Sequence, residues 1–168
     1  GCGTGFLGIF VAQNAPKLRY LTFTDVRQHL LLLTKHNVGR NLGPRIGNGL
    51  TCEYVTAGGL GPLVENARQL GDRFDLIICA PPYLPKVREY GIFDELDVAI
   101  SGTDLLEELV LQGGECAKKL FVQFSMMAMP EFQEACATAD LRWDVRGTKW
   151  VPLRIPPIAP WHPRTDYG

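Results

Sequence analysis

Short runs of β-branched and aromatic residues alternate in this chain with longer segments of helical periodicity, and this alternation limits the possible fold most. The strand-like runs cover residues 18–24, 50–56, 74–79 and 120–125. Helical segments occupy residues 6–14, 26–41, 63–70 and 103–112, between or before these runs. Strands that alternate with helices pair in parallel, because each helix returns the chain across the sheet. We therefore expect an α/β fold with a doubly wound, mostly parallel sheet.

The C-terminal part departs from this alternation. A helix is expected from Pro130 to about residue 138, because proline favours the first turn of a helix. Two closing strands, at residues 141–146 and 149–155, would form an antiparallel hairpin around Gly147. We interpret residues 1–155 as one α/β domain and residues 156–168 as a proline-rich, extended tail.

Composition excludes several classes of protein. The 168 residues are 46% hydrophobic and 21% charged, and 17 Lys and Arg against 18 Asp and Glu leave a net charge of −1. That balance argues against a protein that binds duplex nucleic acid by a broad basic face. No apolar stretch reaches the ~18 residues of a membrane span, so we expect a soluble chain that does not act at a membrane.

The cysteines and histidines indicate neither a disulfide framework nor a metal site. Five cysteines is an odd number, and no CxxC pair is present. Three histidines without ligand-like spacing make a structural zinc site improbable, so no metal is expected. Reduced thiols are typical of a cytoplasmic protein.

A glycine-rich loop opens the chain, with Gly1, Gly3 and Gly5 separated by Cys2 and Thr4. Glycines allow a sharp turn and a close approach of the backbone to a ligand. The helix that follows presents unpaired N–H groups to an anion. The alternative is a strand-to-helix connection that needs glycine only for its own geometry.

Asp25 closes the next strand, 20 residues after Gly5. A carboxylate at this place can accept two hydrogen bonds from a ribose diol, as in dinucleotide and nucleoside sites. It can equally cap the helix that follows, and the two roles are compatible.

The third feature is the stretch FDLIICAPPYLP, residues 74–85. Here a strand runs directly into Pro81, Pro82 and Tyr83, and the prolines stiffen the exit from the sheet. Turn carbonyls are left to accept hydrogen bonds from a substrate, and the tyrosine ring offers a face for a planar group. The alternative is a rigid loop with a packed tyrosine.

Together these features resemble the class I S-adenosylmethionine-dependent methyltransferases that carry an (Asn/Asp/Ser)-Pro-Pro-(Tyr/Phe) motif. The stretch at residues 74–85 is most similar to the release-factor glutamine and small-domain ribosomal RNA members. The resemblance covers most of residues 1–145 and implies a Rossmann-like methyltransferase fold with S-adenosylmethionine as cofactor. It also implies methyl transfer to a nitrogen of a protein side chain or of a nucleic-acid base, and the methyl acceptor itself is a protein, an RNA or a small molecule.

The resemblance assigns roles to particular positions. The loop of residues 1–5 would line the methionine part of the cofactor, and Asp25 would hold its ribose. Val26, Gly59 and Leu60 would lie near the adenine. The methyl-acceptor site would be formed by the four residues of the proline motif, which are Ala80, Pro81, Pro82 and Tyr83.

Three departures from the family pattern qualify these roles. Ala80 stands where Asn, Asp or Ser is usual, and a methyl group accepts no hydrogen bond. The third strand-like segment of the family pattern ends in Ala57-Gly58-Gly59 without the acid or amide that contacts adenine. The family's first strand would precede Gly1, so we expect a gap in the middle of the sheet, to be explained by a truncated sequence or by a partner chain that supplies the strand.

Two other functions compete with methyl transfer. One is a non-catalytic S-adenosylmethionine-binding homologue or subunit, which the alanine at position 80 favours. The other is an NAD-dependent oxidoreductase, because residues 3–8 match GxGxxG and Asp25 matches its ribose-binding acid.

Overall fold

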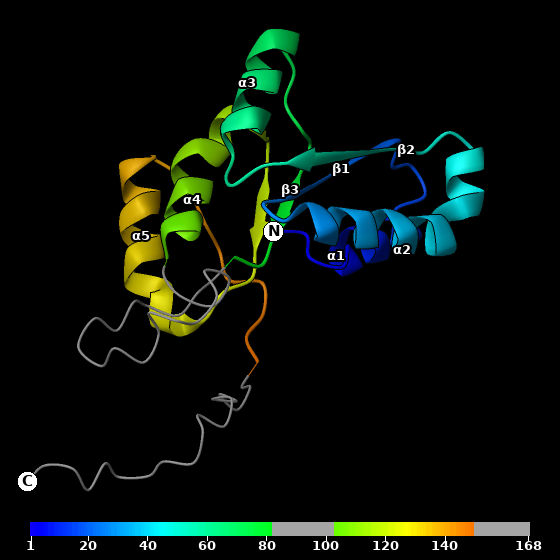
Figure 1. Ribbon diagram of the computed structural model, residues 1–168. Coiled ribbons are helices and arrows are strands. Elements are labelled where there is room, and N and C mark those ends of the chain that lie inside the picture. Colours follow the sequence, from blue (N-terminus) through cyan, green and yellow to red (C-terminus); the bar gives the residue numbers. More distant parts are fainter. Residues whose placement is uncertain (82–102, 150–168) are drawn as a thin grey trace, which may run out of the picture.

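The computed structural model describes residues 1–81 and 103–149, in which helices alternate with short parallel strands (Figure 1). In chain order the elements are α1 (Phe6–Asn14), β1 (Tyr20–Asp25), α2 (Gln28–Gly47), β2 (Thr51–Thr56), α3 (Gly61–Leu70), β3 (Ile77–Cys79), α4 (Asp104–Cys116), β4 (Leu120–Val122), a 3₁₀ turn η1 (Met126–Ala128) and α5 (Met129–Thr138). The chain is thus a mixed helix and strand protein with parallel pairing, in agreement with the expected α/β class.

The strands form two separate parallel pairs. β1 pairs with β2 over six residues, from Tyr20 opposite Thr51 to Asp25 opposite Thr56. β3 pairs with β4 over three residues, and an isolated bridge from Phe74 to Ala117 extends this pair at one end. Within the described residues no ladder joins the two pairs, so β1 and β3 each have one edge without a strand partner there.

The first pair belongs to a unit with its own hydrophobic core. Figure 1 shows α1 and α2 together on one side of β1 and β2. The amphipathic face of α2 packs inward, since its buried residues recur every three or four positions. The core of this unit consists of buried side chains from α1, β1, α2 and the start of β2: Ile9, Ala12, Phe23, Leu31, Val38, Leu42 and Leu50.

The second pair carries α3, α4 and α5. Figure 1 shows α4 and α5 side by side next to β3 and β4. Leu109 and Cys116 of α4 are buried against Leu63 and Val64 of α3. Val110 of the same helix is buried against α5. Helix α4 is therefore the centre of this unit and contacts a helix on each side.

Helix α2 runs further than predicted. The helix expected at residues 26–41 begins at Gln28 and continues through Pro44 to Gly47. The proline removes one helical hydrogen bond, and tertiary contacts compensate for this loss. Leu42 is completely buried, and the Arg45 guanidinium donates hydrogen bonds to the carbonyls of Ala12, Ala15 and Leu18.

The prediction of a C-terminal hairpin is wrong for its first strand. Residues 141–149 form no helix or strand, and residues 150–155, which would hold the other half, lie outside the described residues together with the tail at 156–168. An isolated hairpin is marginal in water, and β4 is only three residues long and offers little edge to add to. The helix expected at 103–112 also runs further, to Cys116.

Candidate functional site

The glycine loop is attached to the carboxyl end of β1. The amino group of Gly1 donates to the carbonyl oxygen of Thr24 at 2.9 Å, and the N–H of Cys2 donates to the same oxygen at 2.8 Å. Gly3 and Gly5 both have left-handed backbones, with φ of 56° and 80°. A side chain would strain both positions, so the loop needs its glycines for conformation.

Asp25 holds this loop in place. Its Oδ2 accepts a hydrogen bond from the N–H of Gly3, and its Oδ1 accepts one from the N–H of Arg27, both at 2.9 Å. The side chain is only 3% exposed. Burial by itself raises the pKa of Asp25, but the N–H groups of Arg27 and Gly3 and the charge of the Gly1 amino group outweigh it, so the pKa lies below its usual range.

The helix-cap interpretation of Asp25 is correct in part. The residue that caps α2 is Arg27, whose side chain makes no capping hydrogen bond. Asp25 lies two residues earlier and satisfies the N–H of that cap residue. Each carboxylate oxygen has a second lone pair, so the structural role leaves acceptor capacity for a ligand.

Helix α2 holds the glycine loop through residues that the sequence analysis did not identify. The hydroxyl of Thr34 donates to the carbonyl of Gly3 at 2.8 Å, and the amide of Asn37 donates to the carbonyl of Thr4 at 3.0 Å. A Cβ on Gly5 would lie 2.7 Å from the methyl of Thr34. Thr34 is a polar residue on the buried stripe of its helix, and that signal could have identified it.

The loop after β2 lies near the start of α2. A Cβ on Gly58 would lie 3.8 Å from the side chain of Val26, which is 65% exposed. A carboxylate does reach this loop, although none follows β2 in sequence. Oε1 of Glu108 in α4 accepts a hydrogen bond from the N–H of Leu60 at 2.7 Å, and its Oε2 would lie 2.6 Å from a Cβ on Gly59. No sequence signal pointed to Glu108, because the contact depends on how α4 packs.

The exit from β3 carries the last of the predicted site residues. Burial raises the pKa of the Cys79 thiol, and the positive charge of the Gly1 amino group partly lowers it. Ala80 is exposed and Pro81 is buried, whereas Pro82 and Tyr83 lie outside the described residues.

The predicted residues that the structure describes lie at the carboxyl ends of three strands. Gly1 to Gly5, Asp25 and Val26 meet at the end of β1. Gly59 and Leu60 follow the end of β2, and Ala80 and Pro81 follow the end of β3. The carboxyl ends of parallel strands are where α/β proteins bind ligands.

The backbone of the glycine loop has open space beside it at Gly1 and Gly3. Nothing lies within 4 Å of a Cβ built on Gly1 or on Gly3. A ligand could therefore approach the backbone of Gly1 and Gly3. Asp25 is 3% exposed, so only a group that reaches past this backbone would meet its remaining lone pairs.

No family model, curated protein or solved structure matches this chain. Among the described helices, none is both long enough and apolar enough to cross a membrane. The same residues contain no cluster of three His, Cys, Asp or Glu side chains that would hold a metal ion.

Proposed function

We propose that this chain is an S-adenosylmethionine-dependent methyltransferase of class I that transfers a methyl group to a nitrogen of a protein side chain or of a nucleic-acid base. The proposal includes a Rossmann-like arrangement of the two parallel strand pairs, with Ala80, Pro81, Pro82 and Tyr83 at the acceptor side. The five free thiols are consistent with a reducing compartment, and we propose a cytoplasmic location.

One observation carries the proposal. The glycine loop is held by Asp25 at the carboxyl end of β1, and Ala80 and Pro81 follow the carboxyl end of β3. A donor bound at the loop and an acceptor bound after β3 would therefore meet at one edge.

The chain's own residues contribute orientation rather than a nucleophile. S-adenosylmethionine supplies, when bound, a methyl group on a good leaving group. The ionised Asp25 accepts hydrogen bonds from ribose hydroxyls, and the exposed side chain of Val26 offers an apolar contact for the base. The backbone carbonyls around Ala80 and Pro81 accept hydrogen bonds from the acceptor nitrogen, because neither side chain can. In-line positioning of two reactants is itself a large source of rate.

An extended segment between β1 and β3 would complete the sheet. Each of these strands has an edge without a strand partner in the described part of the chain. Gly1 already bonds to Thr24, so a segment that leads into Gly1 would start beside β1. We propose that such a segment, from this protein or from a partner chain, fills the gap.

Calorimetry tests the proposal directly. S-adenosylhomocysteine and NAD are titrated into the chain and into the variant Asp25→Ala, with Asp75→Asn as a control on an exposed carboxylate of the other unit. We expect one-to-one binding of S-adenosylhomocysteine, loss of that binding in Asp25→Ala, and no change in the control. Binding of NAD alone would favour the oxidoreductase, and binding of neither compound would reject both.

Ala80 favours a second candidate, a homologue that binds the cofactor without catalysis. Its methyl side chain is exposed and accepts no hydrogen bond. Loss of one such transition-state contact costs about 2–4 kcal/mol in other enzymes. Methyl transfer that appears only in an Ala80→Asn variant would favour the non-catalytic homologue, and transfer by the unmodified chain would exclude it.

A further inference from the structure

The near-zero net charge of the chain conceals two oppositely charged parts. Residues 1–52 contain six Lys and Arg and a single acidic residue, Asp25, which gives a net charge of +5. The rest of the chain carries −6. Because Asp25 is buried, no acidic side chain is exposed in the first part. The surface of α1 and α2 is therefore more basic than the composition of the whole chain indicates.

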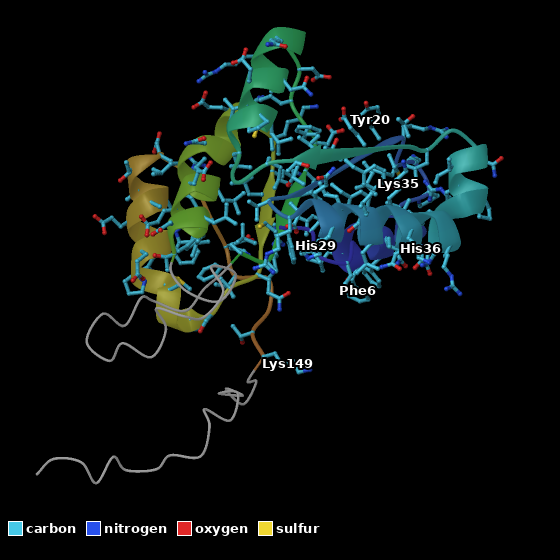
Figure 2. The ribbon with its side chains drawn as sticks, in the orientation of Figure 1. Phe6, Tyr20, His29, Lys35, His36 and Lys149 are labelled. Carbon is cyan, nitrogen blue, oxygen red and sulfur yellow. The ribbon has the colours of Figure 1, made fainter. Side chains whose placement is uncertain are left out.

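Helix α2 displays two of these basic groups, Lys35 and Arg40, on its exposed side together with two histidines. His29, His36 and Arg40 follow one another at spacings of seven and four residues, which places them on one stripe of the helix. Lys35 lies one row away and is also exposed. Within the described residues none of the four makes an ion pair or a side-chain hydrogen bond. Figure 2 shows His29 and His36 along α2, with Phe6 near them on α1.

A groove lies beside this stripe, between α1 and α2. Its volume is about 220 Å³, and it is lined by Thr4, Phe6, Ile9, Phe10, Gln13, Asn37 and Asn41. Phe6 and Phe10 are 69% and 55% exposed, and their rings are stacked with centroids 6.4 Å apart. Both rings therefore expose a large apolar surface to water and do not pack into the core of the fold.

The opposite wall of the groove is polar. The amide nitrogens of Asn37 and Asn41 are used for contacts inside the protein, with the carbonyls of Thr4 and Asn37 respectively. Their side-chain Oδ1 atoms make no hydrogen bond within the part of the chain that the structure describes. Amide side chains of this kind recognise the edges of nucleobases, and aromatic rings stack on their faces.

We propose that the groove between α1 and α2 binds an unpaired base of a single-stranded nucleic acid, whose phosphates run along His29, His36 and Arg40. Stacking platforms combined with a basic track are the means by which proteins hold single strands. The groove adjoins the proposed methyl-transfer site, because Thr4 belongs to both, but its binding of a strand does not depend on that activity.

Other anionic partners fit the groove less well. An anionic membrane surface would bury the polar wall of Asn37, Asn41 and Gln13 in an apolar medium. Burial of amide groups without hydrogen-bond partners costs free energy. An acidic peptide would use the basic stripe but leave the stacked Phe6 and Phe10 exposed. Only a polyanion with planar apolar groups uses both features.

Fluorescence anisotropy with a labelled 12-mer of oligouridine, without cofactor, tests the proposal. The variants are Phe6→Leu, which keeps an apolar side chain but removes the stacking ring, and the double reversal Lys35→Glu and Arg40→Glu. The matched control reverses Lys119 and Lys149, two exposed lysines of the acidic part. Circular dichroism establishes that each variant keeps the wild-type fold.

We expect binding that weakens about 7- to 50-fold between 50 and 200 mM salt, which corresponds to roughly two to four phosphate contacts. Phe6→Leu should weaken it by about 5-fold or more, as expected for one stacked base. The double reversal should also weaken it more than the Lys119 and Lys149 control does. Equal binding of a 12-residue polyglutamate, an unchanged affinity in Phe6→Leu, or binding only to phosphatidylserine vesicles would overturn the proposal.

Discussion

Replacement of Asp25 by asparagine is the sharpest test of how the glycine loop is held. The carboxylate accepts hydrogen bonds from the N–H groups of Gly3 and Arg27, both at 2.9 Å, in a buried position. Asparagine preserves the shape of the side chain but has only one acceptor atom. Its NH2 group would face the second N–H donor, so one of the two bonds is replaced by a repulsive contact.

The expected loss follows from this geometry. A hydrogen bond to a charged group contributes about 1.5–3 kcal/mol, and a buried donor left unpaired adds to the cost. We therefore expect Asp25→Asn to reduce the free energy of unfolding by about 2–4 kcal/mol, measured as a shift of the urea midpoint. The matched control Asp75→Asn removes an exposed carboxylate that pairs with Lys118, and its midpoint should stay close to that of the wild type.

The pH dependence gives an independent check. The pKa of folded Asp25 is below that of the unfolded chain, which is about 3.9 for an aspartate. Its contribution to stability is therefore complete above the unfolded pKa and is lost as the pH falls through the folded pKa. The difference between wild type and Asp25→Asn should stay constant from pH 8 to 5 and shrink below pH 4. A difference below about 1 kcal/mol at pH 7, or one that grows toward acid pH, would refute the reasoning.

Three further experiments, with five substitutions between them, test the same unit and its neighbour. Thr34→Val removes the hydroxyl that supports the glycine loop and should cost about 1–2 kcal/mol in urea unfolding, whereas no loss would mean that the loop does not depend on α2. Gly8→Ala places a methyl against an aromatic ring of β1 and should destabilise by about 1–3 kcal/mol, while Gly39→Ala in open space should stabilise by about 0.5–1 kcal/mol; thermal unfolding that reverses this order contradicts the packing. Glu108→Ala leaves an N–H of the loop after β2 unpaired and should lower the melting temperature, whereas Glu108→Gln keeps an acceptor and should restore most of the loss.

Local sequence patterns predicted most of the elements. The helix at residues 6–14 has the bounds that glycine before it and Pro16 after it indicate. The strands at β1 and β2 agree with prediction to within one or two residues, because β-branched residues alternate there. Tertiary contacts decided the remaining cases. Helix α2 passes through Pro44 since Leu42 and Arg45 are fixed by neighbouring elements, and periodicity alone does not report such contacts.

The candidate site was predictable where one segment carries the signal. The glycine loop and Asp25 were identified from residue type and spacing, and they lie in contact. Thr34 and Asn37 support the loop from 30 residues away, and only the polar position of Thr34 on a buried stripe hinted at this. Glu108 approaches the loop after β2 from a distant helix, a contact that depends on tertiary packing. The charge asymmetry was present in the sequence, but a net charge for the whole chain averages it out.

The central claim is that the opening turn and the segment after Cys79 border one nucleoside-binding edge. Amide chemical shifts of the ¹⁵N-labelled chain, recorded during titration with S-adenosylhomocysteine, test it most directly. We expect the signals of Gly3, Asp25, Cys79 and Ala80 to move together with one dissociation constant. Shifts confined to α4 and α5, or shifts at Gly3 that leave Cys79 and Ala80 unchanged, would contradict it.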